Sequence, residues 1–441
     1  MKFQGLTGRV ILPEDPDYNR ARQEYNLAVD KYPAAIVYCF DQRDVANAVI
    51  WSREREIPLR IRSGGHNYEG YSTGDGDLVI DTTCMNDITV NAGEDTVGVQ
   101  AGTRLLPLYE RLAEYGYTFP GGTCPAVAIS GLVLGGGIGL SVRLLGLTAD
   151  SLIEAEMIDA AGEALTANCN CHADLFWALR GAGGGNFGVV TNYKFGLLKT
   201  VDKITLIQLR WDNNLLARNS FIGIWQDWLP DLDRRLSAFS GIYKRGAWMN
   251  AFFYGRPEEA QIVLGPILAI PGITRRIIEY VPFISAVERI GAGYPRRDAF
   301  QAPGRFVYCR FTGEQLGTLA AIMDKAPSET ESSLRVYSLG GAVRDVGPEA
   351  TAFTARNADY IMVITSSWEN KNEEPLHRAW IQAGYDYIHQ ITRGSYVNFP
   401  YAQTPCYEVA YFQEHLTRLQ CIKRKYDPDD IFHFPQSIRL P

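Results

Sequence analysis

Three short apolar segments follow one another closely between residues 77 and 102, and their spacing restricts the kind of sheet that they can form. The segments are DLVIDTT, ITVNAG and TVGVQAG, and each has the composition of a β-strand. Parallel neighbouring strands need a crossover connection of about a dozen residues or more, which the short gaps between these segments do not provide. The sequence therefore predicts an α+β fold with a mixed sheet and argues against a doubly wound parallel sheet.

The chain before these segments predicts a β-α-β start. The apolar runs AAIVYCF and PLRIR flank the stretch DQRDVANAVIWSREREI, whose apolar residues recur at helical spacing, and Asp41 is suited to cap that helix. With 441 residues, of which 46% are hydrophobic, the chain is long for a single core. Glycines become sparser near residue 200, so we expect two domains with a change at that point.

Charge and hydropathy exclude several classes of partner. The formal net charge is −7, which gives no general attraction to phosphate backbones or anionic membrane surfaces. The N-terminal segment has no basic region followed by an apolar core, and no apolar stretch approaches the ~18 residues of a membrane span. We therefore expect a soluble, cytoplasmic protein that binds neither nucleic acid nor membranes. The sequence does not indicate an oligomeric state.

The eight cysteines are scattered along the chain, which favours reduced thiols over a disulfide scaffold. Cys169, Cys171 and His172 lie together in NCNCHADLF and raise the question of a metal site. No second Cys or His pair lies nearby in the sequence. We therefore interpret this segment as a loop that leads into a helix, and we predict no metal site.

Two glycine clusters each carry one nucleophilic side chain. RSGGHN contains His66, and GGTCPAVAISGLVLGGGIGL contains Cys124. A backbone without Cβ atoms can approach a flat or anionic ligand closely, and successive bare N–H groups can hold a pyrophosphate. Tight turns and close strand packing are the alternative explanation. These residues alone leave His66 open as a structural imidazole, a metal ligand or a covalent attachment point.

A third glycine segment, GAGGGNFG, matches the GxGxxG pattern from Gly183 to Gly188. In a Rossmann fold that pattern follows a strand and opens a helix, so that the pyrophosphate lies on the helix N-terminus. Here a helix-like segment precedes the glycines and the strand-like VVTNYKF follows them. The context therefore argues against Rossmann-type NAD binding, which we keep only as a remaining alternative.

At these residues the chain resembles the berberine bridge enzyme-like flavin oxidases of the vanillyl-alcohol oxidase and p-cresol methylhydroxylase superfamily. The resemblance rests on RSGGHNYEGYS, on GGTCPAV followed by GGGIG and LLGLTADSL, on ADLFWALRGAGGGNFGVVT, and on SYVNFP through KYDPDDIFHFPQSI. It implies FAD as the cofactor. It also implies a discontinuous FAD-binding domain from residues 1–200 and 396–441, and a substrate-binding domain from 201–395 on an antiparallel sheet covered by helices.

The resemblance implies that FAD is attached by two covalent bonds. The histidine of the family's GGH motif bonds the 8α-methyl group of FAD and the cysteine of its GxCP motif bonds C6, and His66 and Cys124 occupy these positions. Imidazole and thiolate are nucleophilic enough for such bonds. The residues implied to contact the pyrophosphate, adenine, ribityl and isoalloxazine parts, each with an alternative role in a turn or sheet, are Arg62, Ser63, Gly64, Gly65, Asn67, Gly122, Gly131, Gly135, Gly136, Gly188, Val190 and Asn398.

The implied reaction transfers a hydride from a substrate carbon to flavin N5, after which O2 is reduced to H2O2. Val127 falls at the family's oxygen-gating position, where valine goes with oxidases. The family's catalytic bases are missing, because Phe399 and Ile361 occupy positions where relatives carry a tyrosine and a glutamate. Tyr401 and Tyr68 are therefore our candidates for the base.

His415 replaces a family asparagine, and we interpret it as a surface residue of a helix; a protonatable group beside the flavin is the alternative. We expect sugar or oligosaccharide alcohols as substrates. Oxidation or oxidative cyclisation of a secondary-metabolite alcohol or amine is the second hypothesis, and a flavin-fold protein that binds a small molecule without turnover is the third.

Overall fold

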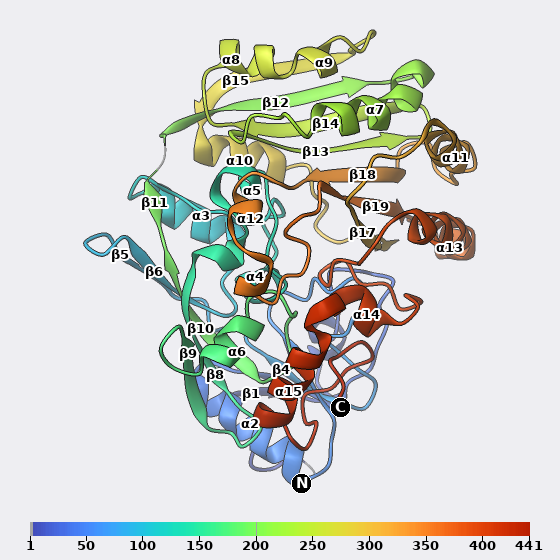
Figure 1. Ribbon diagram of the computed structural model, residues 1–441. Coiled ribbons are helices and arrows are strands. Elements are labelled where there is room, and N and C mark those ends of the chain that lie inside the picture. Colours follow the sequence, from blue (N-terminus) through green and yellow to red (C-terminus); the bar gives the residue numbers. More distant parts are fainter. Residues whose placement is uncertain (1–2, 200) are drawn as a thin grey trace.

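A four-stranded sheet near the N-terminus begins with the β-α-β unit that the sequence predicts. The computed structural model describes residues 3–199 and 201–441 (Figure 1). Helix α2 (Gln42–Glu54) starts at Asp41, whose side chain accepts hydrogen bonds from two backbone N–H groups of the first turn. The sheet has the order β1-β2-β4-β3, in which β2 and β3 both run parallel to β4. Its strands are β1 (Arg9–Ile11), β2 (Ala35–Tyr38), β3 (Leu59–Arg62) and β4 (Leu78–Asp81).

A second, five-stranded sheet is antiparallel throughout and has the order β5-β6-β10-β8-β9. Strands β5 and β6 follow β4 without an intervening helix, as their close spacing predicts. The α+β character predicted for this part of the chain is thus confirmed, but the three segments do not share one mixed sheet, because β4 pairs in the first sheet and β5 and β6 pair in the second. The strands are β5 (Ile88–Asn91), β6 (Thr96–Gln100), β8 (Leu152–Ile158), β9 (Ala164–Asn168) and β10 (Val189–Gly196).

Short helices and two further strands connect and flank these sheets. Helix α6 precedes the glycine segment 181–188 and β10 follows it, which confirms the helix–glycine–strand order expected from the sequence. Cys169 and Cys171 lie in an exposed loop that leads into α6, also as expected. The elements are α1 (Tyr18–Ala21), α3 (Leu105–Ala113), β7 (Tyr117–Thr118), α4 (Ile129–Leu134), α5 (Val142–Leu145), η1 (Thr148–Ser151), α6 (Ala173–Ala178) and β11 (Leu198–Lys199).

An eight-stranded antiparallel sheet occupies the upper half of Figure 1. Its order is β15-β12-β14-β13-β18-β19-β16, and β17 pairs with β19 beside β16. All of its strands lie between residues 203 and 367. They are β12 (Lys203–Trp211), β13 (Leu236–Tyr243), β14 (Gly246–Phe253), β15 (Arg275–Pro282), β16 (Phe300–Gln301), β17 (Gly304–Val307), β18 (Ser332–Ser338) and β19 (Tyr360–Ser367).

Alternate residues give this sheet two different faces. One face is apolar and packs against helices α7, α11 and α13, forming a core with large side chains such as Trp211, Trp225 and Met362. Residues of the opposite face line the same cavity as the glycine-rich segments. The remaining elements are α7 (Leu215–Trp228), α8 (Pro257–Val263), α9 (Gly265–Leu268), α10 (Phe283–Gly291), α11 (Gly313–Asp324), α12 (Ala342–Asp345), η2 (Pro348–Ala350), η3 (Lys371–Glu373), α13 (Glu374–Ile391), α14 (Tyr407–Phe412), η4 (Gln413–His415) and α15 (Leu416–Tyr426).

The C-terminal segment returns to the N-terminal sheets, and it lies beside them in the lower half of Figure 1. Lys425 of α15 forms an ion pair of 2.7 Å with Asp174 of α6. Residues 339–358 also pack against the N-terminal part, where Arg356 forms a buried ion pair of 2.7 Å with Asp150. The division into residues 1–200 plus 396–441 and residues 201–395 stays a prediction.

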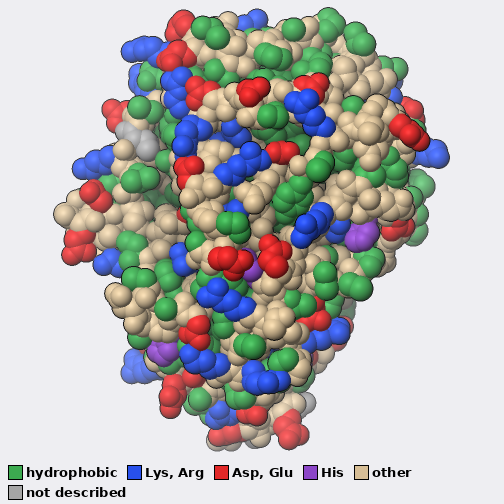
Figure 2. Space-filling model, in the orientation of Figure 1, with side chains coloured by type: hydrophobic (Ala, Val, Ile, Leu, Met, Phe, Trp, Pro, Cys, Tyr) green, Lys and Arg blue, Asp and Glu red, His purple; other side chains and the backbone are tan. Residues whose placement is uncertain are grey.

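The face of the molecule shown in Figure 2 carries acidic, basic and uncharged side chains interspersed with one another. No single sign of charge dominates this face. Within residues 3–199 and 201–441, no helix combines the length and the apolar character that a membrane crossing requires.

Candidate active site

A cavity of ≈ 1790 Å³ lies between the polar face of the eight-stranded sheet and the glycine-rich segments. Pockets for single small molecules usually measure about 300–1,000 Å³, so this cavity has room for a large cofactor and a substrate together. It is lined by twelve of the residues that the sequence places in the site, namely Ser63, Gly64, Gly65, His66, Asn67, Tyr68, Cys124, Val127, Gly131, Gly188, Val190 and Asn398.

The first two glycine clusters meet at Gly64. A Cβ atom at this position would lie 2.8 Å from the backbone nitrogen of Ala128, so only glycine allows the two segments to approach so closely. Gly65 has a φ of +67°, a conformation that glycine adopts without steric cost. The loop after β3 and the segment around Cys124 therefore form one continuous side of the cavity.

Arg62 does not line the cavity, although the loop that it begins does. Its side chain is buried, and its Nε donates a hydrogen bond of 2.5 Å to Asp81 while Nη1 lies 3.5 Å from a carboxylate oxygen of Glu24. These contacts hold the end of β3 against the end of β4. The guanidinium thus supports the loop from its buried side.

His66 is held in a form that suits nucleophilic attack. Its ring stacks on that of Tyr25, with 4.1 Å between ring centroids. Burial and the nearby Arg104 guanidinium lower the pKa of His66 to about 4, against a smaller opposing effect of a hydrogen bond to the Ala126 backbone. The imidazole is therefore neutral at physiological pH and keeps a free electron pair.

Cys124 interacts with the same short stretch of backbone. Burial raises the pKa of its thiol, whereas hydrogen bonds from the backbone at Ala126 and Val127 and the charge of Arg104 act in the opposite direction. His66 and Cys124 thus both hydrogen-bond the Ala126 backbone, and the charge of Arg104 acts to lower the pKa of both side chains. The structure brings the two nucleophiles to one side of one cavity.

Gly135, Gly136 and Gly122 do not line the cavity, and the reasons differ. A Cβ atom at Gly135 would overlap the side-chain amide of Asn398, so this glycine makes room for a residue that does line it. The Asn398 amide donates hydrogen bonds of 3.1 Å to the Leu132 carbonyl and to the Tyr396 hydroxyl. Gly136 packs against Phe353, and Gly122 packs against leucine side chains.

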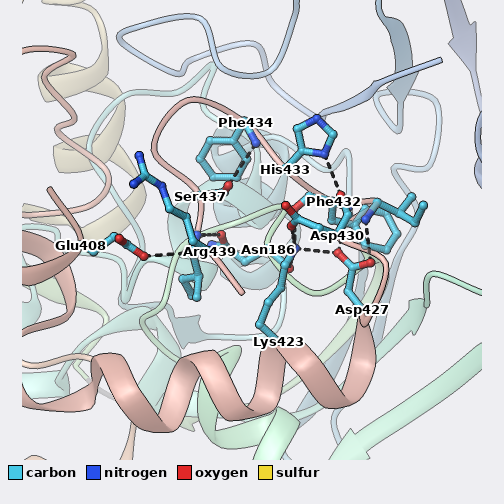
Figure 3. A network of polar contacts seen from close by, with 12 residues as sticks. Asn186, Glu408, Lys423, Asp427, Asp430, Phe432, His433, Phe434, Ser437 and Arg439 are labelled. Carbon is cyan, nitrogen blue, oxygen red and sulfur yellow. Dashed lines mark hydrogen bonds and ion pairs between the residues drawn. The ribbon is translucent and has the colours of Figure 1, made fainter. Parts of the chain in front are cut away.

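The third glycine segment is anchored to the C-terminal tail by a buried cation. Figure 3 shows Lys423 of α15 directed at Asn186, Asp427 and Asp430. Its fully buried Nζ donates to the Asn186 carbonyl at 2.9 Å and to the Asp427 carboxylate at 2.6 Å. The Asn186 side chain also accepts a hydrogen bond of 2.9 Å from the Ile438 backbone. These bonds fix the segment that carries Gly188 into the cavity.

The structure corrects the expectation that Tyr401 reaches the substrate. Tyr401 belongs to the core on the far face of the sheet, and its hydroxyl hydrogen-bonds the side-chain amides of Gln382 and Gln403. Tyr68 does line the cavity, where its ring lies parallel to that of Phe399 at 5.3 Å. Burial raises the pKa of Tyr68 well above its usual value. Tyr68 is therefore better suited to donate a hydrogen bond than to accept a proton.

The interpretation of His415 as a surface residue is wrong. Its side chain is buried at 2% exposure, packs edge-on against Trp177, and lies 3.3 Å from the Ala352 carbonyl through Nδ1. It does not line the cavity either. His415 therefore belongs to the packing between residues 349–352 and the C-terminal helices.

Comparison with known proteins agrees with this arrangement. Residues 33–168 match the family model described as FAD binding domain, and residues 395–439 match the model described as Berberine and berberine like. The FAD-linked oxidoreductase YgaK of Bacillus subtilis, described as uncharacterized, is 35% identical over 450 residues, which cover 99% of this chain and 98% of YgaK. This chain belongs to the berberine bridge enzyme-like family of FAD-linked oxidoreductases.

Two further berberine bridge enzyme-like relatives match along nearly the whole chain. Reticuline oxidase of Eschscholzia californica is 24% identical, covering 99% of this chain and 90% of the relative. The solved structure of Physcomitrella patens BBE-like 1 superimposes with a TM-score of 0.93 at 28% identity, covering 99% of this chain and 98% of that one. The predicted family and two-domain fold are therefore confirmed, and the protein is an FAD-linked oxidoreductase.

The residues present fit FAD. The bare backbone N–H groups after β3 are suited to a pyrophosphate, and the cavity extends from this loop to the sheet. Gly188 also lines the cavity, and the absence of a Cβ atom there lets its backbone pack closely against the Met157 side chain and the Ile158 carbonyl. His66, Cys124 and Asn398 line the same cavity and are the residues that would hold the isoalloxazine.

The cavity face of the sheet carries polar and aromatic side chains that no motif in the sequence indicates. Side chains that line the cavity from four of its strands include Gln208, Arg210, Trp248, Asn250, Ser333, Arg335, Tyr337 and Thr365. The alternation of polar and apolar residues along β12 and β18 is the sequence signal that could indicate these side chains. It distinguishes the two faces of a strand but does not say which face borders a cavity.

Proposed function

We propose that this flavoenzyme oxidises a hydroxyl-bearing carbon of a bulky substrate, with carbohydrate alcohols as the first candidates, and that O2 is the final electron acceptor. Bound FAD supplies the hydride acceptor and then the reductant of O2 to H2O2. Gln208, Asn250 and Thr365 present amide and hydroxyl groups to the cavity beside the indole of Trp248. This mixture of hydrogen-bonding groups and an aromatic surface, together with the size of the cavity, supports a large polyhydroxylated substrate.

Oxidation of a secondary-metabolite alcohol or amine is the second hypothesis, favoured by the apolar cluster of Tyr68, Phe300 and Phe399 in the same cavity. Anaerobic mixing of the holoenzyme with candidate alcohols separates the hypotheses. Bleaching of the flavin absorbance by sugars supports the first, and bleaching only by aromatic alcohols or amines supports the second. No bleaching by either class would favour a protein that binds without turnover.

We further propose that FAD is attached covalently to both His66 and Cys124. The observation that carries this proposal is their convergence on the Ala126 backbone at one side of the cavity. Two attachment points hold the ring system without requiring protein to cover it, which is compatible with an open substrate cavity. They also withdraw electron density from the ring and so favour hydride acceptance.

Attachment through His66 should be insensitive to pH over most of the range in which the protein is stable. The neutral imidazole is the nucleophile, and it persists above a pKa of about 4 instead of the usual value near 6.5. In a Cys124→Ala variant, where only the His66 bond can form, we expect the yield of acid-stable flavin to fall only as the pH approaches that value. A midpoint near 6.5 for flavin incorporation into the apoprotein would contradict the buried, neutral state of His66.

Val127 lies between Cys124 and Ala128 on the same side of the cavity, and we propose that it admits O2 to the flavin. A Val127→Leu variant adds one methylene group at this position. We expect its reduced flavin to react with O2 about tenfold more slowly, which corresponds to about 1.4 kcal/mol in the barrier. Stopped-flow measurements of anaerobic reduction and of reoxidation test this. Equal slowing of both half-reactions would show a general disturbance of the site instead of an effect on O2.

A further inference from the structure

Arg335 stands in the middle of β18 and directs its side chain into the cavity. Ser333 and Tyr337, two residues to either side on the same face, line the cavity with it. Directly across the sheet, Arg335 pairs with Gly241 of β13 and Val363 of β19. Neither neighbour brings a carboxylate. The positive charge of the Arg335 guanidinium is therefore not neutralised by a cross-strand neighbour.

Three other arginines of the same cavity are paired with carboxylates, whereas Arg275 and Arg297, which also line it, form no ion pair among the described residues. Arg22 lies 2.6 Å from Asp30, Arg60 lies 2.7 Å from Asp77, and Arg210 lies 2.9 Å from Asp212. Within residues 3–199 and 201–441, Arg335 forms no ion pair with a carboxylate within 4.0 Å.

One carboxylate interacts electrostatically with Arg335 from beyond the 4.0 Å of an ion pair. It belongs to Asp298, whose pKa burial raises to about 6 and whose side chain hydrogen-bonds Ser367. Because Asp298 is engaged with Ser367, it does not complete a pair with the guanidinium.

The hydrogen-bond partners of Arg335 are hydroxyl groups. Its Nε donates to the Ser333 hydroxyl at 3.1 Å, and its side chain also hydrogen-bonds Tyr337. Burial lowers the pKa of Arg335, but the neighbouring phenols of Tyr337, Tyr294 and Tyr68 outweigh this effect and the pKa is raised overall. The guanidinium therefore stays charged, and its side chain is only partly exposed, so a charge without an ionic partner is costly there.

We propose that Arg335 binds a carboxylate group of the substrate, so that the natural substrate is an acid that also carries the hydroxyl to be oxidised. Guanidinium N–H groups match the geometry of a carboxylate, and charge-assisted hydrogen bonds of this kind are roughly twice as strong as neutral ones. The Tyr337 ring packs against Phe399 at 5.7 Å, next to Asn398, so the carboxylate site borders the place of the isoalloxazine. The inference rests on the proposed function, because it specifies the class of its substrate.

Calorimetric titration of the holoenzyme with matched pairs of ligands tests this site. D-gluconate is compared with D-glucitol, and benzoate is compared with benzamide, so that each pair differs at the anionic group. We expect at least one anion to bind about tenfold or more tightly than its neutral partner, in line with the strength of a charge-assisted pair. We also expect that anion to perturb the flavin absorption spectrum, which places it in the cavity.

Three variants show whether Arg335 is responsible. Arg335→Gln is expected to remove the preference for the anion, and Arg335→Lys is expected to keep only part of it, because an ammonium group lacks the planar array of donors. Arg210→Gln is the matched control, since that arginine lines the same cavity but is already paired with Asp212. It should leave the preference unchanged. If Arg335→Gln yields no folded holoenzyme, the Arg335→Lys variant decides.

Two results would overturn the proposal. In one, neither anion binds more tightly than its neutral partner to the natural protein; in the other, the preference survives in both Arg335 variants. Benzoate and benzamide carry no hydroxyl group that the flavin could oxidise, so their binding is measured without turnover and is independent of the oxidase function. A flavin that neutral alcohols reduce in the absence of any anion preference would leave the proposed function standing and reject the carboxylate site.

Discussion

A Lys423→Met variant should lose about 3–5 kcal/mol of unfolding free energy, which is the typical effect of removing one partner of a buried ion pair. Lys423 and Asp427 are both fully buried, and the Lys423 ammonium also donates to the Asn186 and Phe432 carbonyls. Methionine fills a similar volume but leaves the buried Asp427 carboxylate without its counter-charge and two carbonyl groups without the ammonium donor. Urea denaturation followed by circular dichroism measures the loss.

The control for this variant is Lys425→Met, two residues further along α15. Lys425 also forms an ion pair of 2.7 Å, with Asp174, but its side chain is 58% exposed. Exposed pairs contribute about 0–1 kcal/mol, so this variant should unfold almost as the natural chain does. Similar small losses for both variants would mean that the Lys423 network does not hold the third glycine segment in place.

Replacing both His66 and Cys124 by alanine should abolish covalent flavin, whereas each single replacement should retain it. Each single variant keeps one nucleophile on the side of the cavity where both contact the Ala126 backbone. Loss of one ring substituent makes the flavin a weaker hydride acceptor, so we expect anaerobic reduction to slow by about tenfold in each single variant, or about 1.4 kcal/mol in the barrier. The fraction of flavin that stays with the acid-precipitated protein and the rate of bleaching measure the two effects.

A matched control for these variants is Cys84→Ala, which replaces another cysteine of the same part of the chain that does not line the cavity. It should keep both the attached flavin and the rate of reduction. Release of all flavin by either single variant would show that only one of the two residues forms a bond.

Much of the fold follows from local patterns in the sequence. The Asp41 cap, the strands without crossover helices and the helix–glycine–strand order around residues 181–188 all depend on residues close together in the chain, and all are present. Local motifs that combine glycines with a single reactive side chain indicate the two nucleophiles, His66 and Cys124. Their meeting in one cavity depends on Gly64, where the two segments touch.

The parts of the site that escaped prediction depend on contacts between distant segments. Gly135 leaves room for the side chain of Asn398, although the two residues lie far apart in the sequence. No local sequence pattern indicates this contact. Tyr401 and Arg62 carry plausible functional groups, but their side chains turn toward Gln382 and Asp81. The sequence around Arg335 does not distinguish it from other polar residues on strands. Only the pairing of the strands shows that its cross-strand neighbours are Gly241 and Val363, which carry no charge.

Acid precipitation of the purified natural protein, followed by intact mass measurement of the pellet, tests the central claim most directly. We predict a yellow pellet whose polypeptide mass is increased by that of one FAD, with His66 and Cys124 as the modified residues in peptide mapping. Flavin in the supernatant with an unmodified polypeptide in the pellet would contradict covalent attachment through both residues, although FAD could still bind in the same cavity.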